Sequence, residues 1–233
     1  MKEFKQVCCI IGLYLLTQLP AAALWSAAGI PDRFRAGLSA AAIVLFTGLV
    51  AENYRRRLAL SPADIGLKFP GRSRRLEAAL LVFGAAGAGL AWFALYFRLF
   101  RLALPGVYAG LLAQKGDGLL SALFSDAGSP ASLSALALGL LALAAMEEFL
   151  FRGVIYNYLS RGMSWRKAML WSSAVFALVH LKPSGIPVTF VFGVLCCLLY
   201  RRTGSLAAPA AAHFIYNFSL SLFGKYLVPG GWT

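Results

Sequence analysis

Charged residues, and acidic ones above all, are scarce in this sequence. Only 13% of its 233 residues are charged, with nine acidic against 22 basic side chains and a net charge of +13, while 60% are hydrophobic. A soluble domain has about 25% charged and roughly 45 to 50% apolar residues, so this composition excludes one. The length instead suits seven or eight membrane spans of about 20 residues each. Because the basic residues lie between apolar runs, we expect them to set membrane topology and not to bind nucleic acid.

Cysteine and histidine are also few, and their spacing excludes the common metal and disulfide frameworks. The four cysteines form two adjacent pairs, Cys8 with Cys9 and Cys196 with Cys197, each inside an apolar run. No CxxC spacing is present, so neither a zinc ribbon nor a disulfide scaffold is indicated. The chain has two histidines and no HExxH sequence, which excludes the usual zincin helix.

Long apolar runs are abundant, and they predict an all-α, polytopic transmembrane helix bundle. The first run continues too far for a cleaved signal peptide, so we interpret it as a retained span. A weaker stretch at 105–124 is either an interfacial or re-entrant helix or an eighth span. The seven predicted spans are 7–29, 37–51, 76–99, 133–158, 168–181, 186–200 and 206–223.

The basic residues predict which side of the membrane each loop occupies. With seven spans and a cytoplasmic N-terminus, fourteen basic residues fall on the inner side and seven on the outer side. Loops rich in Lys and Arg stay cytoplasmic, so we predict that the N-terminus and the basic loop 55–75 lie inside. We expect a multi-pass integral membrane protein, of the inner (plasma) membrane if the chain is bacterial.

Two glutamates stand in the middle of an apolar helix predicted at 138–158. An ionised side chain at membrane depth costs roughly 2.5 to 3.5 kcal/mol, so Glu147 and Glu148 need partners or water. Arg152 follows Glu148 by four residues and can pair with it on one helix face. Glu147 is rotated by about 100° from its neighbour and points elsewhere.

Both histidines also lie in apolar runs that we predict to be helical. His180 comes four residues after Phe176, and the same spacing separates His213 from Asn217, so each pair shares a helix face. Counted from the nearest inner basic residues, Glu147 and both histidines lie at depths of roughly 17 to 21 Å. A carboxylate, two imidazoles and an amide at one depth of the membrane suit hydrolysis. Glu147 can take a proton from water, and neutral donors can stabilise an oxyanion. The same set equally suits a metal that polarises a carbonyl group.

Three sequences of fixed spacing mark these helices: EEFLFRG at 147–153, FALVH at 176–180 and HFIYN at 213–217. They resemble the EExxxR, FxxxH and HxxxN motifs of the CAAX protease and bacteriocin-processing family of intramembrane proteases. The resemblance covers about a third of the chain and implies peptide-bond cleavage at membrane depth. It also implies two parts within one membrane domain, N-terminal helices with the basic loop at 1–130 and a catalytic core at 131–233.

The resemblance assigns a role to each residue of the motifs. The catalytic residues it implies are Glu147 as water activator, His180 as its assistant, and His213 with Asn217 as the oxyanion site. The supporting residues are Glu148 and Arg152, which brace the helix as a pair, and Phe176, which packs beside His180. The cofactor stays open: either none, or a divalent metal such as Zn with Glu147, His180 and His213 as ligands.

These observations predict an intramembrane endopeptidase that cuts a membrane-associated or exported protein. Its expected partners are a protein or peptide substrate and the lipid bilayer, with no nucleic acid. One alternative is a catalytically inactive relative that binds a peptide, as immunity proteins do. Another is an ion or proton transporter with the same buried groups as a relay. The run 168–181 is too short to span about 30 Å, so we expect it to end early in a polar turn that admits water from the non-cytoplasmic side.

Overall fold

The computed structural model describes residues 2–17, 28–29, 32–68, 71–113 and 130–227, and all the regular structure in these ranges is helical. This confirms the predicted all-α class. The elements in chain order are α1 Lys2–Thr17, α3 Asp32–Arg57, η1 Arg72–Arg74, α4 Arg75–Ala103, α5 Pro105–Ala113, α7 Pro130–Glu148, η2 Phe149–Tyr156, α8 Asn157–Gly162, α9 Trp165–Leu178, η3 Pro183–Gly185, α10 Ile186–Thr203 and α11 Ala207–Leu227.

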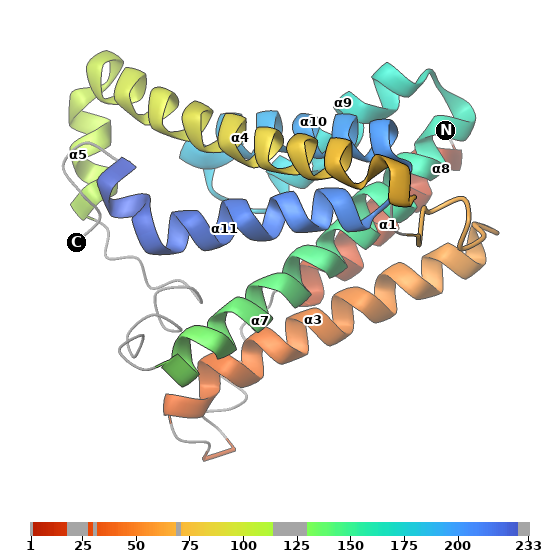
Figure 1. Ribbon diagram of the computed structural model, residues 1–233. Coiled ribbons are helices and arrows are strands. Elements are labelled where there is room, and N and C mark those ends of the chain that lie inside the picture. Colours follow the sequence, from red (N-terminus) through yellow and green to blue (C-terminus); the bar gives the residue numbers. More distant parts are fainter. Residues whose placement is uncertain (1, 18–27, 30–31, 69–70, 114–129, 228–233) are drawn as a thin grey trace.

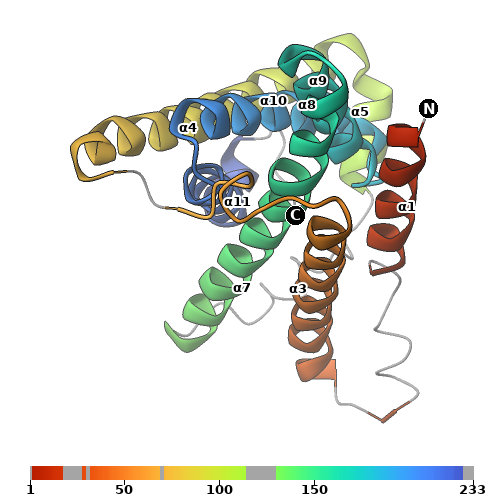
Figure 2. The ribbon, with the colours of Figure 1, turned by 90° about the vertical axis from the view of Figure 1, so that its right-hand side faces the viewer.

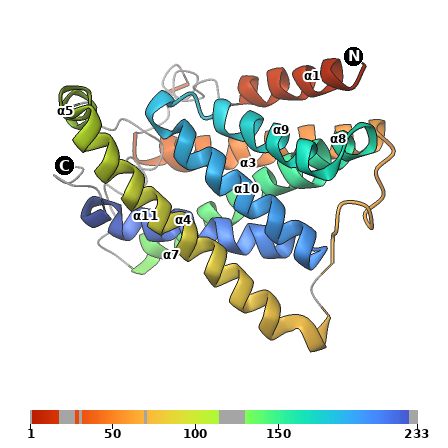
Figure 3. The same ribbon diagram turned by 90° about the horizontal axis from the view of Figure 1, so that it is seen from above.

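The helices form two packed groups that meet along α7 and α11. In the first group α4, α10 and α11 pack against one another, as Figure 1 shows, and α10 lies between α4 and α9 (Figure 3). In the second group α3 packs against both α7 and α1 (Figure 2). Because α11 also packs on α7, residues of α7 face helices of both groups.

Four helical stretches are long and apolar enough to cross a membrane: Gly37–Arg57, Arg75–Ala103, Leu133–Gly162 and Pro183–Thr203. The apolar part of α1 is shorter, and α9 has 14 residues, about 21 Å at the usual helical rise. Within the described residues, length and composition therefore give four spans and do not confirm the predicted seven. Of the stretch 105–124, α5 covers nine residues and 114–124 lie outside the described ranges.

Large apolar side chains cover the outer faces of these helices. Leu45, Phe46 and Leu49 of α3 and Leu80 and Phe83 of α4 are all more than half exposed. A soluble protein rarely exposes an apolar surface that continues along whole helices, whereas lipid requires one. The chain is therefore an integral membrane protein.

The helix that carries both glutamates changes its winding directly after them. α7 continues from Glu148 into the π-helical turns of η2, whose backbone carbonyls also accept hydrogen bonds from side chains. Asn157 Nδ2 donates to the Arg152 carbonyl at 3.1 Å, and Ser172 Oγ of α9 donates to the Phe151 carbonyl at 3.0 Å. The π turns thus tie this helix to α9 beside the predicted site.

The loop after α3 folds back onto the ends of α8 and α10. Arg161 donates to the Leu58 carbonyl at 2.7 Å, and the Tyr200 hydroxyl donates to the Asp64 carbonyl at 3.1 Å. Gly66 has a φ of 66°, and a Cβ there would lie 2.8 Å from the backbone of α10's end. The loop encloses a cleft of about 470 Å³ at this basic end, and none of the predicted site residues lines it.

Candidate active site

Two carboxylates and one imidazole meet where α7 ends against α11. Glu147, Glu148 and His213 expose only 6%, 0% and 3% of their surfaces. His213 Nδ1 lies 2.9 Å from Glu148 Oε1, and His213 Nε2 lies 3.7 Å from Glu147 Oε2. The imidazole ring therefore stands between the two carboxylates and faces each with a different nitrogen.

The contact with Glu148 determines how the ring of His213 can act. An ionised carboxylate only accepts hydrogen bonds, so we assign a proton to Nδ1. Nε2, which faces Glu147, is then an acceptor while the ring is neutral and a donor when the ring is protonated. A neutral His213 therefore carries its one N–H at Nδ1, where Glu148 engages it.

Arg152 is fully buried and holds Glu148 from the other side. Its Nη1 donates to Glu148 Oε1 at 2.7 Å and its Nη2 donates to the Gly193 carbonyl of α10 at 2.9 Å. Within the described residues, Glu148 Oε2 and Arg152 Nε have no hydrogen-bond partner. The guanidinium therefore links the helix of the two glutamates to α10 and neutralises one of the two carboxylates.

The ring of Phe176 occupies the centre of this cluster. The guanidinium carbon of Arg152 lies 4.6 Å from its centroid, and the imidazoles of His180 and His213 meet it edge-on at 4.8 and 5.7 Å. Phe151 packs against the same ring at 5.0 Å. Phe176 thus contacts both histidines, which goes beyond the predicted packing beside His180 alone.

His180 lies outside the helix in which the sequence places it. α9 ends at Leu178, and His180 is exposed in the turn that follows, with Nδ1 2.6 Å from the Phe176 carbonyl oxygen. Leu181 adopts a φ of 53° and Pro183 begins the next turn, so the chain cannot continue as a helix here. This corrects the predicted helical position and confirms the predicted early end of the run 168–181. Because the carbonyl only accepts, we assign a proton to Nδ1, which leaves Nε2 as an acceptor while the ring is neutral.

Asn217 stands one helical turn after His213 on α11 and is half-buried. Their spacing of four residues places both on one face of that helix. Among the described residues no hydrogen bond of the Asn217 amide is recorded, so the amide is available to a ligand that approaches this face. The structure brings Glu147 and His213 together directly, connects His180 to them through Phe176, and places Asn217 beside His213.

A catalytic metal needs several protein side chains that converge on one point. Catalytic zinc takes three protein ligands at about 2.0 to 2.2 Å. Among the described residues, no three His, Cys, Asp or Glu side chains gather around one point. Glu147, His180 and His213 are thus not gathered around one point in the part of the chain that the structure describes.

Comparison with known proteins identifies the part of the chain that carries this cluster. Residues 129–219 match the family model described as type II CAAX prenyl endopeptidase Rce1-like. We call these residues the CAAX protease segment, after the family that they resemble. A stretch of 84 residues is 33% identical to the membrane-embedded CAAX protease MroQ of Staphylococcus aureus (strain USA300), over 34% of each chain. The chain thus matches about a third of the length of that curated relative. No solved structure matches the chain.

The CAAX protease segment runs from α7 into α11 and contains all seven predicted site residues. The helices α1, α3 and α4 precede it, yet they pack directly on it: α3 on α7, and α4 on α10 and α11. The N-terminal helices therefore form part of the surroundings of the cluster.

One residue of the cluster was missed from the sequence. Tyr14 of α1 is 3% exposed, and its hydroxyl donates to Glu147 Oε1 at 3.0 Å. Its ring meets Phe151 edge-on at 5.5 Å between centroids. The only signal in the sequence is a hydroxyl within an apolar run, because a buried tyrosine needs a hydrogen-bond partner.

Proposed function

We propose that this chain is an intramembrane endopeptidase that hydrolyses a peptide bond of a membrane-associated or exported protein, with Glu147 as the base that activates water. The observation that carries the proposal is the contrast between two adjacent glutamates. Glu148 is neutralised by Arg152 at 2.7 Å, whereas the recorded partners of Glu147 are Tyr14 and His213. A buried carboxylate that is not committed to a permanent cation is available to accept a proton from water.

The reaction follows from these positions. Glu147 takes a proton from water while the water oxygen bonds to the carbonyl carbon, which produces an oxyanion. Asn217 and His213, one turn apart on α11, form the oxyanion site and stabilise the negative oxygen through hydrogen bonds. Glu147 then returns the proton to the peptide nitrogen as the C–N bond breaks, and the products are a carboxylic acid and an amine.

His180 assists from the exposed side of the cluster in this proposal. Its Nδ1 is engaged by the Phe176 carbonyl, so its Nε2 is the acceptor that orients the attacking water. Phe176 holds this imidazole relative to His213 through edge-on contacts with both rings. Glu148 and Arg152 support the site as a pair: Arg152 holds Glu148 in place, and Glu148 contacts His213.

The side of access and the membrane topology belong to the same proposal. His180, Leu181 and Lys182 are exposed at the end of α9, whereas Glu147 and His213 are enclosed. Substrate and water then enter at this turn. With seven spans and a cytoplasmic N-terminus, the turn lies on the non-cytoplasmic side, which favours exported substrates. Residues 1–130 would pack around the catalytic core 131–233 in one membrane domain.

Replacing Glu147 by Gln tests the catalytic assignment. The amide keeps the size of the side chain and cannot take a proton, so cleavage should fall by at least about a hundredfold while the folded amount stays the same. The measurement is mass spectrometry of membrane proteins from cells with active or Glu147→Gln enzyme, in search of termini that need the active form. Asn53→Gln is a control, because Asn53 is an exposed side chain of α3. Wild-type turnover by Glu147→Gln would contradict the assignment of the base.

Single cysteines test the side of access. In a chain whose four native cysteines are replaced, Ser184→Cys at the turn should react with a membrane-impermeant thiol reagent added to intact cells. Ser73→Cys in the basic loop should react only after the inner face is opened. The reverse pattern would place the entrance on the cytoplasmic side and make cytosolic proteins the substrates.

A further inference from the structure

The N-terminal helix α1 contributes one polar contact to the buried cluster. It lies outside the CAAX protease segment, and its nearly inaccessible side chains among the described residues are Val7, Ile10 and Tyr14. Two of these three are purely apolar. Tyr14 alone carries a polar group, and its hydroxyl reaches a residue 133 positions away, Glu147.

The direction of this hydrogen bond is fixed by the chemistry of its partners. An ionised carboxylate accepts, so the Tyr14 hydroxyl donates to Glu147 Oε1 over 3.0 Å. The second oxygen, Oε2, is the one that lies 3.7 Å from His213 Nε2. The two oxygens of Glu147 therefore have different neighbours, a fixed donor on one and the ring of His213 on the other.

A carboxylate at the end of a flexible side chain is effective only when one oxygen is aimed at the water it activates. A hydrogen bond to Oε1 restricts rotation of the carboxylate about its last bond and leaves Oε2 facing the ring of His213. The edge-on contact of the Tyr14 ring with Phe151, at 5.5 Å, fixes the donor itself. Phe151 in turn packs on Phe176, the ring that contacts both histidines.

We propose that Tyr14 is a positioning residue for Glu147, so that α1 completes the active site from outside the CAAX protease segment. The proposal rests on the proposed function of Glu147 as the base. Tyr14 does not exchange a proton with substrate; it holds the carboxylate with Oε2 turned toward the position of the attacking water. In this chain, the CAAX protease segment by itself therefore lacks the donor that orients Glu147.

Tyr14→Phe tests the proposal, because it removes the hydroxyl and keeps the ring that packs on Phe151. In the full-length protein in lipid, with a substrate identified from the cleaved termini, kcat should fall about ten- to hundredfold with KM unchanged. Tyr54→Phe is the matched control: Tyr54 is also buried, on α3, with its ring near Arg57. The control should leave kcat and KM at their wild-type values.

A second pair of variants separates positioning from packing. Glu147→Asp withdraws the carboxylate from Tyr14, so adding Tyr14→Phe to it should cost less than twofold in kcat. Tyr14→Leu removes hydroxyl and ring together, and should match Tyr14→Phe in kcat while lowering the unfolding temperature further. Loss of thermal stability by Tyr14→Phe in step with its loss of activity would overturn the proposal, as would an undiminished kcat.

The outcomes also separate this proposal from the one it rests on. Full turnover by Glu147→Gln would contradict the assignment of Glu147 as the base, and with it the positioning role of Tyr14. If Glu147→Gln is inactive and Tyr14→Phe has the wild-type kcat, the proposed function stands and only the positioning role is overturned.

Discussion

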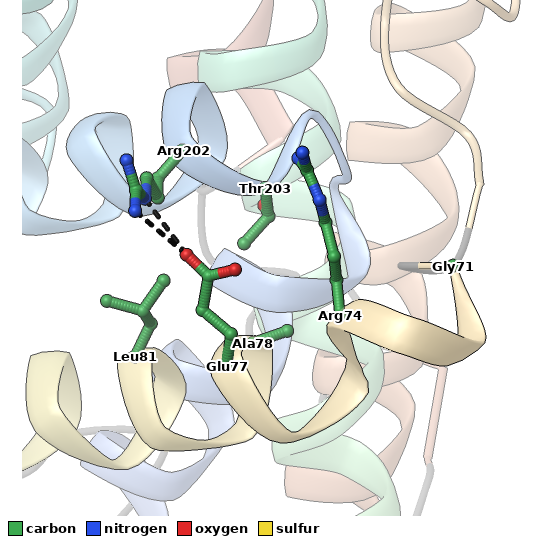
Figure 4. Close-up of a pocket in the computed structure, with 7 residues that line it drawn as sticks. All are labelled: Gly71, Arg74, Glu77, Ala78, Leu81, Arg202 and Thr203. Carbon is green, nitrogen blue, oxygen red and sulfur yellow. Dashed lines mark hydrogen bonds and ion pairs between the residues drawn. The ribbon is translucent and has the colours of Figure 1, made fainter.

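Two Glu–Arg ion pairs of nearly equal length lie at opposite extremes of burial, one within a single helix and one between two helices. Glu148 and Arg152 lie 2.7 Å apart with both side chains fully buried. Glu77 and Arg202 lie 2.9 Å apart, with 47% and 70% of their side-chain surfaces exposed. Figure 4 shows Arg202 of α10 reaching Glu77 in the first turn of α4, across a small pocket. Distance alone therefore does not distinguish the two pairs.

The surroundings do distinguish them. The buried pair also engages His213 Nδ1 on the glutamate side and the Gly193 carbonyl on the arginine side. Removal of either partner leaves a buried charge without its counter-charge, and water cannot replace the lost partner there. At the exposed pair, water replaces a lost partner and salt screens the attraction. We therefore expect the buried pair to contribute much more to stability than the exposed pair.

The largest effect is expected for Arg152→Met. It leaves Glu148 buried without its cation, so the free energy of unfolding should fall by about 3 to 5 kcal/mol. Thermal or denaturant unfolding in detergent measures it. Adding Glu148→Gln should recover part of the loss, because the second substitution removes the uncompensated charge. A stable Arg152→Met protein would show that burial does not separate the two pairs.

A moderate effect is expected for Gly193→Ala, which acts on the backbone that Arg152 binds. A Cβ at Gly193 would lie 3.0 Å from Ser173 Cβ and 3.2 Å from Ser173 Cα, and the backbone of α9 cannot yield cheaply. We expect a loss of about 1 to 3 kcal/mol in the free energy of unfolding. Gly87→Ala on α4 is the matched control, because a Cβ there meets nothing within 4 Å. Equal stabilities of the two variants would show that α10 can move away from α9 without disturbing Arg152.

Contacts within one helix could be predicted from the sequence. The spacing of four residues predicts the pairing of Glu148 with Arg152 and of Phe176 with His180, and both contacts are present. Spacing also indicates that the run 168–181 is too short to span. It does not reveal that His180 leaves the helix, because the turn depends on the positive φ of Leu181.

Contacts between helices could not be predicted in the same way. His213 Nδ1 and Glu148 are 65 positions apart, and Tyr14 and Glu147 are 133 apart. A periodic apolar pattern fixes which face of a helix is buried and leaves open which helix covers it. The polar residues of the motifs could therefore be named, whereas the donor from α1 required the packed structure.

The smallest effect is expected for Glu77→Gln at the exposed pair. Arg202 keeps its contact with water, and exposed ion pairs contribute less than about 1 kcal/mol, so the free energy of unfolding should change by at most about 0.5 kcal/mol. Raising the salt concentration to about 1 M shortens the screening length to roughly 3 Å and should remove even this difference between wild type and variant. The same salt should leave the difference caused by Arg152→Met in place, because ions do not enter the buried cluster. A salt-dependent Arg152→Met effect would mean that water reaches Glu148, and the two ion pairs would then differ in degree only.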